Sequence, residues 1–323
     1  MYKPKDSSAS PRFCGVKTFM RLEHVQTTED VDFAVIGVPF DTGASNRTGQ
    51  RNGPQHIRNF STLLRPYNPD QDINIFDHCG GVDYGDIDVV PGNIHQTYSN
   101  MENFLQPLLS SGVTPVIMGG DHSISLGNLR AFAKQYGPVA LVHFDSHSDT
   151  WDHYFGEKYT HGTPFRRAVE EGLIDVEHSI QVGMRGPLYG QEDIQDARDL
   201  GFEVLTMRDV RKLGYDEVIR KIHERTGDKP VFVSFDIDFV DPAYAPGTGT
   251  PEAAGPTSHE ALDLVRNLDG LNLVGFDLVE VLPAYDSGEI TAMLASTVMF
   301  EMITLIALKK ARLTSRVEQA AQQ

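Results

Sequence analysis

The sequence predicts an α/β protein built as three layers, α/β/α, with a mostly parallel central sheet. Short runs rich in β-branched and aromatic residues recur along the chain, and their apolar residues are continuous rather than alternating. Strands covered on both faces have this pattern, because neither face meets water. Segments with helical spacing lie between the runs, and this alternation of strand and helix is typical of a parallel sheet flanked by helices.

The predicted strands, in chain order, are residues 33–38, 114–120, 139–145, 179–184, 203–207, 230–236 and 271–281. The predicted helices are residues 123–136, 163–172, 215–225, 258–268 and 291–312. No repeat or low-complexity linker divides the chain, so residues 1–323 are predicted to form a single domain. We expect an extended arm over about residues 1–30 and a frayed tail over about 313–323.

Charge and composition narrow the classes of partner. Lys and Arg number 28 against 45 Asp and Glu, and the net charge of -17 would repel nucleic acid and anionic lipid. No apolar run approaches the roughly 20 residues that cross a bilayer, and the first residues lack the apolar core of a signal peptide. We therefore expect a cytoplasmic protein without nucleic-acid or membrane partners. Cys14 and Cys79 are too few for a disulfide framework.

The strongest chemical signal is the stretch HFDSHSD at residues 143–149, directly after a predicted strand. Asp145, His147 and Asp149 are spaced two apart, and side chains at that spacing share one face of an extended chain. The carboxyl ends of strands are where open α/β sheets bind ligands. Burying several carboxylates there without cations would be costly, so the stretch predicts a cation site.

Two further strand ends repeat this pattern. Asp236 and Asp238 follow the apolar run PVFV, and His122 follows TPVI and a pair of glycines that let the backbone pass close to a ligand. Carboxylates with some imidazole favour manganese over zinc, while nickel, iron and cobalt stay open. Six such side chains exceed what one catalytic ion needs, so we predict two ions about 3.5–4 Å apart that share carboxylates and activate water. The sequence thus predicts a metal-dependent hydrolase.

The stretches GGDHS, DSHSD and SFDIDFVDPAYAPGTGTPE resemble those of the ureohydrolase family of arginases, agmatinases and guanidino-acid hydrolases. The resemblance runs from about Asp32 to about Leu305 and includes the segment from Asp41 to Arg58. It implies an arginase-like fold, two Mn²⁺ per subunit, release of urea and an amine from a guanidino compound, and assembly into trimers or hexamers.

Matched residue by residue, the resemblance also implies roles for the site. His122 and Asp149 would bind one ion, His147 and Asp238 the other, and Asp145 and Asp236 would bridge the two. Asp149 is counted as catalytic together with His161, which matches the histidine that relays a proton to the leaving amine. Glu280 resembles the glutamate that pairs with the guanidinium, and a planar guanidinium does favour a bidentate carboxylate. Asp277 is expected to contact the metal-binding side chains rather than the ions themselves.

The far end of the substrate depends on a loop after the DSHSD stretch. Arginases place an asparagine where this chain has Trp151, and an acidic residue near the position of Gly186 and Pro187. We therefore expect agmatine as substrate, with Trp151 and Tyr154 contacting it. The alternatives are guanidinobutyrate or guanidinopropionate, which a basic residue such as Lys158 would favour, formiminoglutamate, and a non-catalytic protein that binds metal or guanidino compounds. A two-metal phosphoesterase would need cationic groups that these stretches lack.

Overall fold

The computed structural model describes residues 1–321. Its main strands are β1 (Phe33–Val38), β4 (Gly81–Asp86), β5 (Thr114–Gly119), β6 (Ala140–Phe144), β7 (Ile180–Met184), β8 (Glu203–Thr206), β9 (Val231–Asp236) and β10 (Leu273–Val279), and β2 (Tyr67–Asn68) and β3 (Ile73–Asn74) form a small hairpin. The helices are α1 (Gly53–Ser61), α2 (Ile94–Ser110), α3 (Ile124–Tyr136), α4 (Pro164–Glu170), α5 (Glu192–Asp199), α6 (Met207–Leu213), α7 (Tyr215–Thr226), α8 (Ser258–Arg266) and α9 (Ile290–Ala321).

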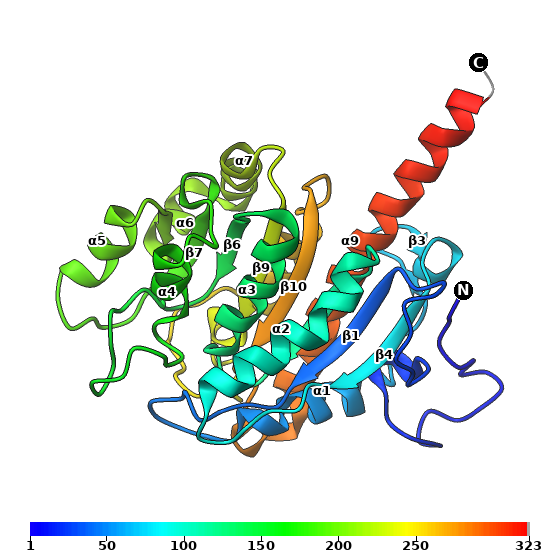
Figure 1. The fold of residues 1–323 in the computed structure, drawn as a ribbon, viewed down its shortest axis with the longest axis horizontal. Coiled ribbons are helices and arrows are strands. Elements are labelled where there is room, and N and C mark those ends of the chain that lie inside the picture. The colour runs from blue at the N-terminus through cyan, green and yellow to red at the C-terminus, as the bar shows by residue number, and fades with distance from the viewer. Residues whose placement is uncertain (322–323) are drawn as a thin grey trace.

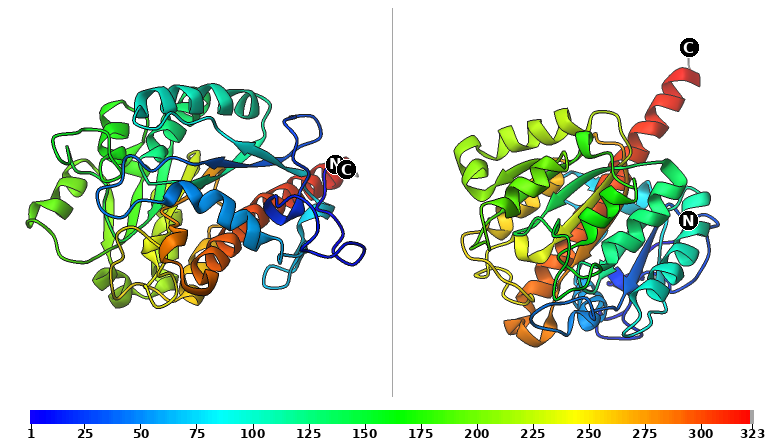
Figure 2. Two further views of the ribbon diagram at one scale, coloured as in Figure 1. Left: turned by 90° about the horizontal axis from the view of Figure 1, so that it is seen from below. Right: turned by 60° about the vertical axis from the view of Figure 1, so that its left-hand side comes forward.

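The large sheet has eight strands in the order β4-β1-β5-β10-β9-β6-β7-β8, and every neighbouring pair is parallel (Figure 1). Apolar residues of α2, α3, α4 and α5 pack on one face, and those of α1, α6, α7, α8 and α9 pack on the other. Figure 2 shows the sheet lying between these helix layers. The predicted three-layer α/β/α class with a parallel sheet is therefore confirmed.

Each of the predicted strand runs contains a strand, but the edge strand β4 was missed. Its sequence GVDYGD has two glycines and two aspartates, which are uncommon in strands. The fold tolerates Asp83 because Arg58 of α1 donates to its carboxylate at 2.8 Å and the backbone N–H of Phe19 donates at 2.7 Å. Tertiary pairing that local sequence does not reveal thus places a buried carboxylate in this strand.

The two ends of the chain differ from each other in structure. Residues 1–30 contain a short 3-10 turn at Phe19–Arg21, whose residues are buried against the body, and an isolated β-bridge from His24 to Asp83. At the other end α9 continues to Ala321, through most of the segment expected to be a frayed tail, and its last turns extend beyond the body (Figure 1). By length and composition α9 could cross a membrane, but 83% of its most apolar stretch is buried inside the protein, as in a core helix.

Candidate metal centre and active site

The strand order brings the predicted site residues together. Strands β5, β10, β9 and β6 are consecutive neighbours, so their carboxyl ends form one edge of the sheet. His122 follows β5, Glu280 follows β10, Asp236 ends β9, and Asp145 follows β6. Residues separated by up to 158 positions thus meet, as in the bond from the His122 backbone N–H to Glu280.

The local backbone differs from the extended chain that the two-residue spacing predicted. β6 ends at Phe144, and the backbone N–H of His147 turns back to donate to Asp145 Oδ1 at 2.6 Å. β9 likewise ends at Asp236, whose carboxylate accepts from the backbone N–H of Asp238 at 2.8 Å in a 3-10 turn. Asp149 has a left-handed backbone with a φ of 52°, which is uncommon for a residue other than glycine. The side chains therefore converge through turns, with their carboxylates fixed by backbone donors.

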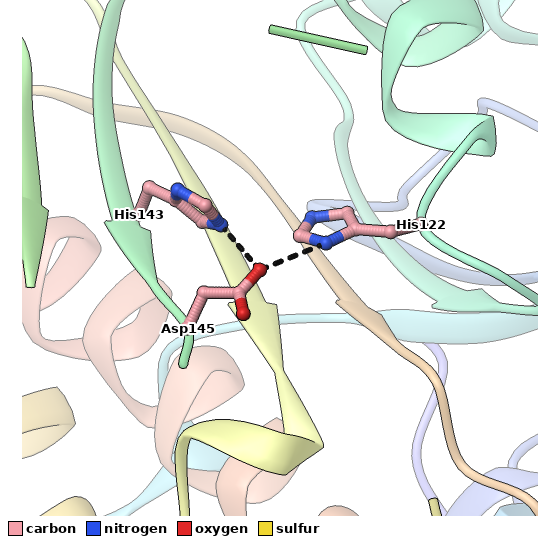
Figure 3. A group of neighbouring side chains, drawn as sticks. All are labelled: His122, His143 and Asp145. Atoms are coloured by element: carbon pink, nitrogen blue, oxygen red, sulfur yellow. Dashed lines mark hydrogen bonds and ion pairs between the residues drawn. The ribbon is translucent and has the colours of Figure 1, made fainter. Parts of the chain in front are cut away.

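The first group of site residues surrounds one nitrogen of His122. Its Nδ1 lies 2.8 Å from Asp149 Oδ2, 3.1 Å from Asp145 Oδ2 and 3.2 Å from Asp236 Oδ2. All four side chains are buried, and Figure 3 shows His122 and Asp145 pointing toward each other. Three carboxylate oxygens around a buried nitrogen form a concave, electron-rich set of donors.

Bonds on the far side of His122 leave this nitrogen free for a cation. Its Nε2 lies 2.9 Å from Ser234 Oγ, and Ser234 donates its own proton to Asp277 Oδ1 at 2.6 Å. Ser234 can then only accept from His122, so Nε2 carries the ring proton and Nδ1 has a lone pair. Nδ1 is buried with no hydrogen-bond partner among the described residues. An orphaned nitrogen facing carboxylates fits a metal ion well.

The second group lies beside the first and shares Asp145 with it. His147 Nδ1 is 3.2 Å from Asp238 Oδ2 and 3.5 Å from Asp145 Oδ1. These atoms lie close enough together to hold one ion. Ser146 donates to Asp238 Oδ1 at 2.7 Å and so orients that carboxylate. Asp145 presents one oxygen to each group, which is the arrangement a bridging carboxylate needs.

Without a cation, burial and mutual repulsion or attraction shift the pKa values of these side chains. Burial, together with the charges of Asp238 and Asp145, raises the pKa of Asp236 well above its usual value. Burial alone would lower the pKa of His122, but the carboxylates of Asp145, Asp149 and Asp236 close to Nδ1 outweigh burial and raise that pKa while no cation lies between them. Divalent ions would remove both perturbations by compensating the carboxylates directly.

Sequence reasoning gave no role to His143, which lies directly behind Asp145. Gln181 Nε2 donates to His143 Nδ1 at 3.0 Å, so His143 Nε2 carries the proton and donates to Asp145 Oδ2 at 2.8 Å (Figure 3). The close contact with His143 is part of the reason that the pKa of Asp145 is lowered against the effect of burial. The two-residue spacing of HFDSHSD includes His143 and was the available signal. No sequence signal pointed to Gln181.

Glu280 lies beside the metal groups, and its carboxylate is held by three donors. Oε1 accepts from the His122 backbone N–H at 2.9 Å and from His161 Nδ1 at 3.0 Å, and Oε2 accepts from Gln50 Nε2 at 2.9 Å. Its φ of 66° is left-handed, a strained conformation that turns the side chain at the end of β10. Burial would raise the pKa of Glu280, but the bond and charge of His161 lower it, so the carboxylate is ionised. Gln50 was not predicted.

A cavity of about 600 Å³ opens over the two metal groups. Trp151 and Tyr154, both expected to contact substrate, line it, and their ring centroids are 5.2 Å apart. Tyr189, which was not predicted, approaches from a second loop, and its hydroxyl is hydrogen-bonded to that of Tyr154. Lys158 is exposed and does not line the cavity. The basic side chain in the lining is instead Arg47, stacked 4.3 Å from the ring centroid of Tyr285.

Comparison with known proteins agrees with this geometry. Residues 31–304 match the arginase family. The chain is 43% identical to the guanidinopropionase of Pseudomonas aeruginosa over 96% of this chain and 98% of that protein, and 43% identical to the mitochondrial agmatinase of Gallus gallus over 94% and 89%. The structure of proclavaminate amidino hydrolase from Streptomyces clavuligerus superposes with a TM-score of 0.88 at 42% identity, covering 93% of this chain and 99% of that one.

A more distant solved structure carries the expected metal. It is a Trypanosoma cruzi formiminoglutamase with Mn²⁺, which has a TM-score of 0.81 at 26% identity over 90% of this chain and 98% of that one. The family match covers most of the chain, and the relatives with about 40% identity span nearly its full length. The fold, the paired His and Asp groups and these matches lead to one conclusion: the chain belongs to the arginase family of ureohydrolases, enzymes that hydrolyse guanidino groups.

Proposed function

We propose that this enzyme holds two Mn²⁺ ions and releases urea and an amine from a linear guanidino compound, most favourably agmatine, which would give putrescine. The observation that carries the proposal is the unpartnered Nδ1 of His122 among three carboxylates, next to a second His and Asp group. We assign the ions to His122, Asp145, His147, Asp149, Asp236 and Asp238. When bound, a pair of such ions supplies a nucleophile from water at neutral pH and stabilises charge at the reacting carbon.

The protein's own groups position the substrate and move the proton. Glu280 is ionised and fixed by three donors, which leaves its negative charge and one lone pair on Oε2 available to a guanidinium. His161 Nδ1 contacts the same carboxylate, and we assign His161 to the proton transfer to the leaving amine. Burial would lower the pKa of His161, but its bond to Glu280 and the charge of that carboxylate raise the pKa to about 9, so His161 holds a proton at neutral pH.

Agmatine is favoured by the aromatic rings around the cavity. Its far end is an ammonium, and Trp151, Tyr154 and Tyr189 line the cavity close to one another. A cation near the faces of such rings is stabilised by about 0.5–2 kcal/mol. Arginine would add an α-carboxylate beside its ammonium, and this chain has Trp151 and Pro187 where arginases place an asparagine and an acidic residue.

A guanidino acid such as guanidinobutyrate or guanidinopropionate is the alternative. Two cavity groups favour it: the guanidinium of Arg47, and the indole Nε1 of Trp151, which is buried without a partner among the described residues. Both are donors and suit a carboxylate. Glu252, also in the lining, has the opposite preference. Steady-state kinetics on both classes of substrate will show whether an ammonium or a carboxylate is preferred at the far end.

The test is urea release by purified protein loaded with Mn²⁺ after chelation. The panel contains agmatine, guanidinobutyrate, guanidinopropionate and arginine, and steady-state constants are measured for each. Agmatine as best substrate supports the proposal, and a guanidino acid as best substrate keeps the reaction but changes its substrate. Binding of these compounds without urea release from any of them would contradict the proposal and leave a non-catalytic binding protein.

We further propose a homo-oligomer, a trimer or hexamer, located in the cytoplasm. The oligomer follows only from the resemblance to the family, and the location from the composition of the chain. Light scattering coupled to size-exclusion chromatography gives the mass of the assembly directly. A monomer near the 35.8 kDa of one chain would contradict the first of these expectations.

A further inference from the structure

We propose that the hydroxyl of Ser45 carries the proton that His161 exchanges with the cavity during the reaction. This inference rests on the proposed function and deepens it. Ser45 belongs to the loop between β1 and α1, far in sequence from His161. Its neighbours in sequence form no motif that would indicate a role in catalysis. It lines the cavity over the metal groups and is partly exposed there.

Both nitrogens of the His161 ring are engaged by protein groups. Nδ1 lies 3.0 Å from Glu280 Oε1. Nε2 lies 2.7 Å from Ser45 Oγ, and the backbone N–H of Ser45 donates to the same nitrogen at 3.1 Å. Only 12% of the His161 side chain is exposed. The part of the ring that borders the cavity therefore offers no free nitrogen, and any proton leaving or reaching His161 has to pass Glu280 or Ser45.

Transfer through Glu280 would conflict with the other task of that residue. A protonated Glu280 loses the negative charge that pairs with the guanidinium, and substrate binding would weaken at the moment of proton transfer. Ser45 has no such conflict, because a hydroxyl can accept one proton while it gives up another and stays neutral. The geometry thus favours Nε2 and Ser45 as the path.

The contact between Ser45 and His161 is built into the backbone. The N–H of His161 donates to the carbonyl of Gly43 at 3.0 Å, and the N–H of Gly43 donates to Asp121 Oδ2 at 2.7 Å. A Cβ at position 43 would lie 2.7 Å from Ser123 Oγ, so glycine lets this loop approach closely. These bonds fix the Ser45 loop to the loop that carries His161.

The proton transfer balances as follows. As the bond from the guanidinium carbon to the leaving nitrogen breaks, its electron pair goes to that nitrogen, which takes the hydroxyl proton of Ser45. Ser45 Oγ takes the proton from Nε2 of the His161 imidazolium in the same movement, which leaves His161 neutral. The unprotonated Nε2 then accepts the backbone N–H of Ser45, which is the arrangement in the structure. Water in the cavity then returns a proton to His161 through Ser45 by the reverse route.

The decisive experiment is a double-mutant cycle with Ser45→Ala and His161→Asn, measured as urea release by Mn²⁺-loaded protein. Ser45→Ala removes the hydroxyl but keeps the backbone N–H that supports His161. We expect it to lower kcat by about 10²-fold, the lower end of what a proton-transfer group contributes, with little change in KM or bound metal. In the His161→Asn background, Ser45→Ala should lower kcat no further, because the two groups act as one unit.

Two more variants separate proton transfer from a structural role. Ser45→Thr keeps a hydroxyl and should recover most of the turnover, and millimolar imidazole should partly restore Ser45→Ala by replacing the missing donor. Ser99→Ala is the control, because Ser99 is an exposed serine that bonds only within its own helix. Wild-type kcat in Ser45→Ala, or equal losses in both backgrounds of the cycle, would overturn the assignment of Ser45 alone. Absence of urea from the wild-type enzyme would instead overturn the proposed function and this inference with it.

Discussion

Replacing Glu280 with glutamine should weaken substrate binding while leaving the fold intact. In the wild type, Oε1 accepts from two donors and Oε2 accepts from Gln50. The amide oxygen of the substituted side chain can keep the two bonds at Oε1, and its NH₂ would then face Gln50. The Oε1 of Gln50 is buried without a partner among the described residues, so rotation of the Gln50 amide would provide the missing acceptor. The protein-side bonds of position 280 therefore survive the change.

The substrate side loses both charge and an acceptor. A hydrogen bond to a charged group contributes about 1.5–3 kcal/mol, so the contact between the guanidinium and the remaining lone pair of Oε2 contributes roughly that amount. At about 1.4 kcal/mol per tenfold, Glu280→Gln should lower kcat/KM by about 10–10². Bound manganese and the melting temperature should stay close to wild type. Glu224→Gln, on the exposed face of α7, is the matched control.

Steady-state urea assays, metal analysis and thermal melting decide the outcome together. A kcat/KM within about threefold of wild type would show that Glu280 is not the guanidinium partner. Loss of metal or a large drop in melting temperature would show that Glu280 supports the metal groups instead, which the backbone bond to His122 makes a concrete alternative to exclude.

Chelation should abolish urea release and manganese should restore it best, because the site offers mainly oxygen ligands; activity in metal-free protein would contradict this. Asp145→Ala should lose more bound manganese than His122→Ala in metal titrations, since Asp145 faces both groups; equal mild losses would argue against bridging. His161→Asn should lower kcat by about 10²–10⁴ and keep its metal, whereas metal loss would make His161 a ligand. Because His161 is protonated below its raised pKa of about 9, wild-type turnover should fall as pH rises through that value, and the Asn variant should lack this limb. Agmatine should exceed arginine in kcat/KM by at least about 10², since leaving a charged group unpaired costs more than about 1–3 kcal/mol; arginine as the better substrate would refute this.

The sequence predicted the parallel sheet and picked out the side chains that the structure brings together, because both are local patterns. Apolar runs without alternation mark covered strands, and acidic and histidine residues cluster directly after them, as in DSHSD. The structure brings those residues into contact at four neighbouring strand ends. Their spacing predicted convergence for a partly incorrect reason, since Asp145 and Asp238 lie in turns that follow the strands.

Residues that act across the sheet could not be predicted from local patterns. Arg47 lies about a hundred positions from the loop in which a basic residue was sought, and it enters the cavity only because the β1–α1 loop lies next to the end of β5. Ser45 and Gln50 come from the same loop. A strand order of β1-β5-β10 is what places this loop against His161 and Glu280.

The groups behind the proposed ligands explain why the site can be ready for metal before metal arrives. His122 holds its proton on the nitrogen that faces Ser234 and Asp277, and His143 holds its proton on the nitrogen that faces Asp145. In each case a buried polar residue fixes the tautomer: Ser234 for the first ring and Gln181 for the second. The His122 ring, with one proton fixed on the far side, presents Nδ1 to an ion without rotating, and the His143 ring, with its proton toward Asp145, orients that carboxylate. The carboxylates are likewise held by backbone N–H groups, so the protein bears the cost of gathering these charges when it folds, and metal binding recovers that free energy.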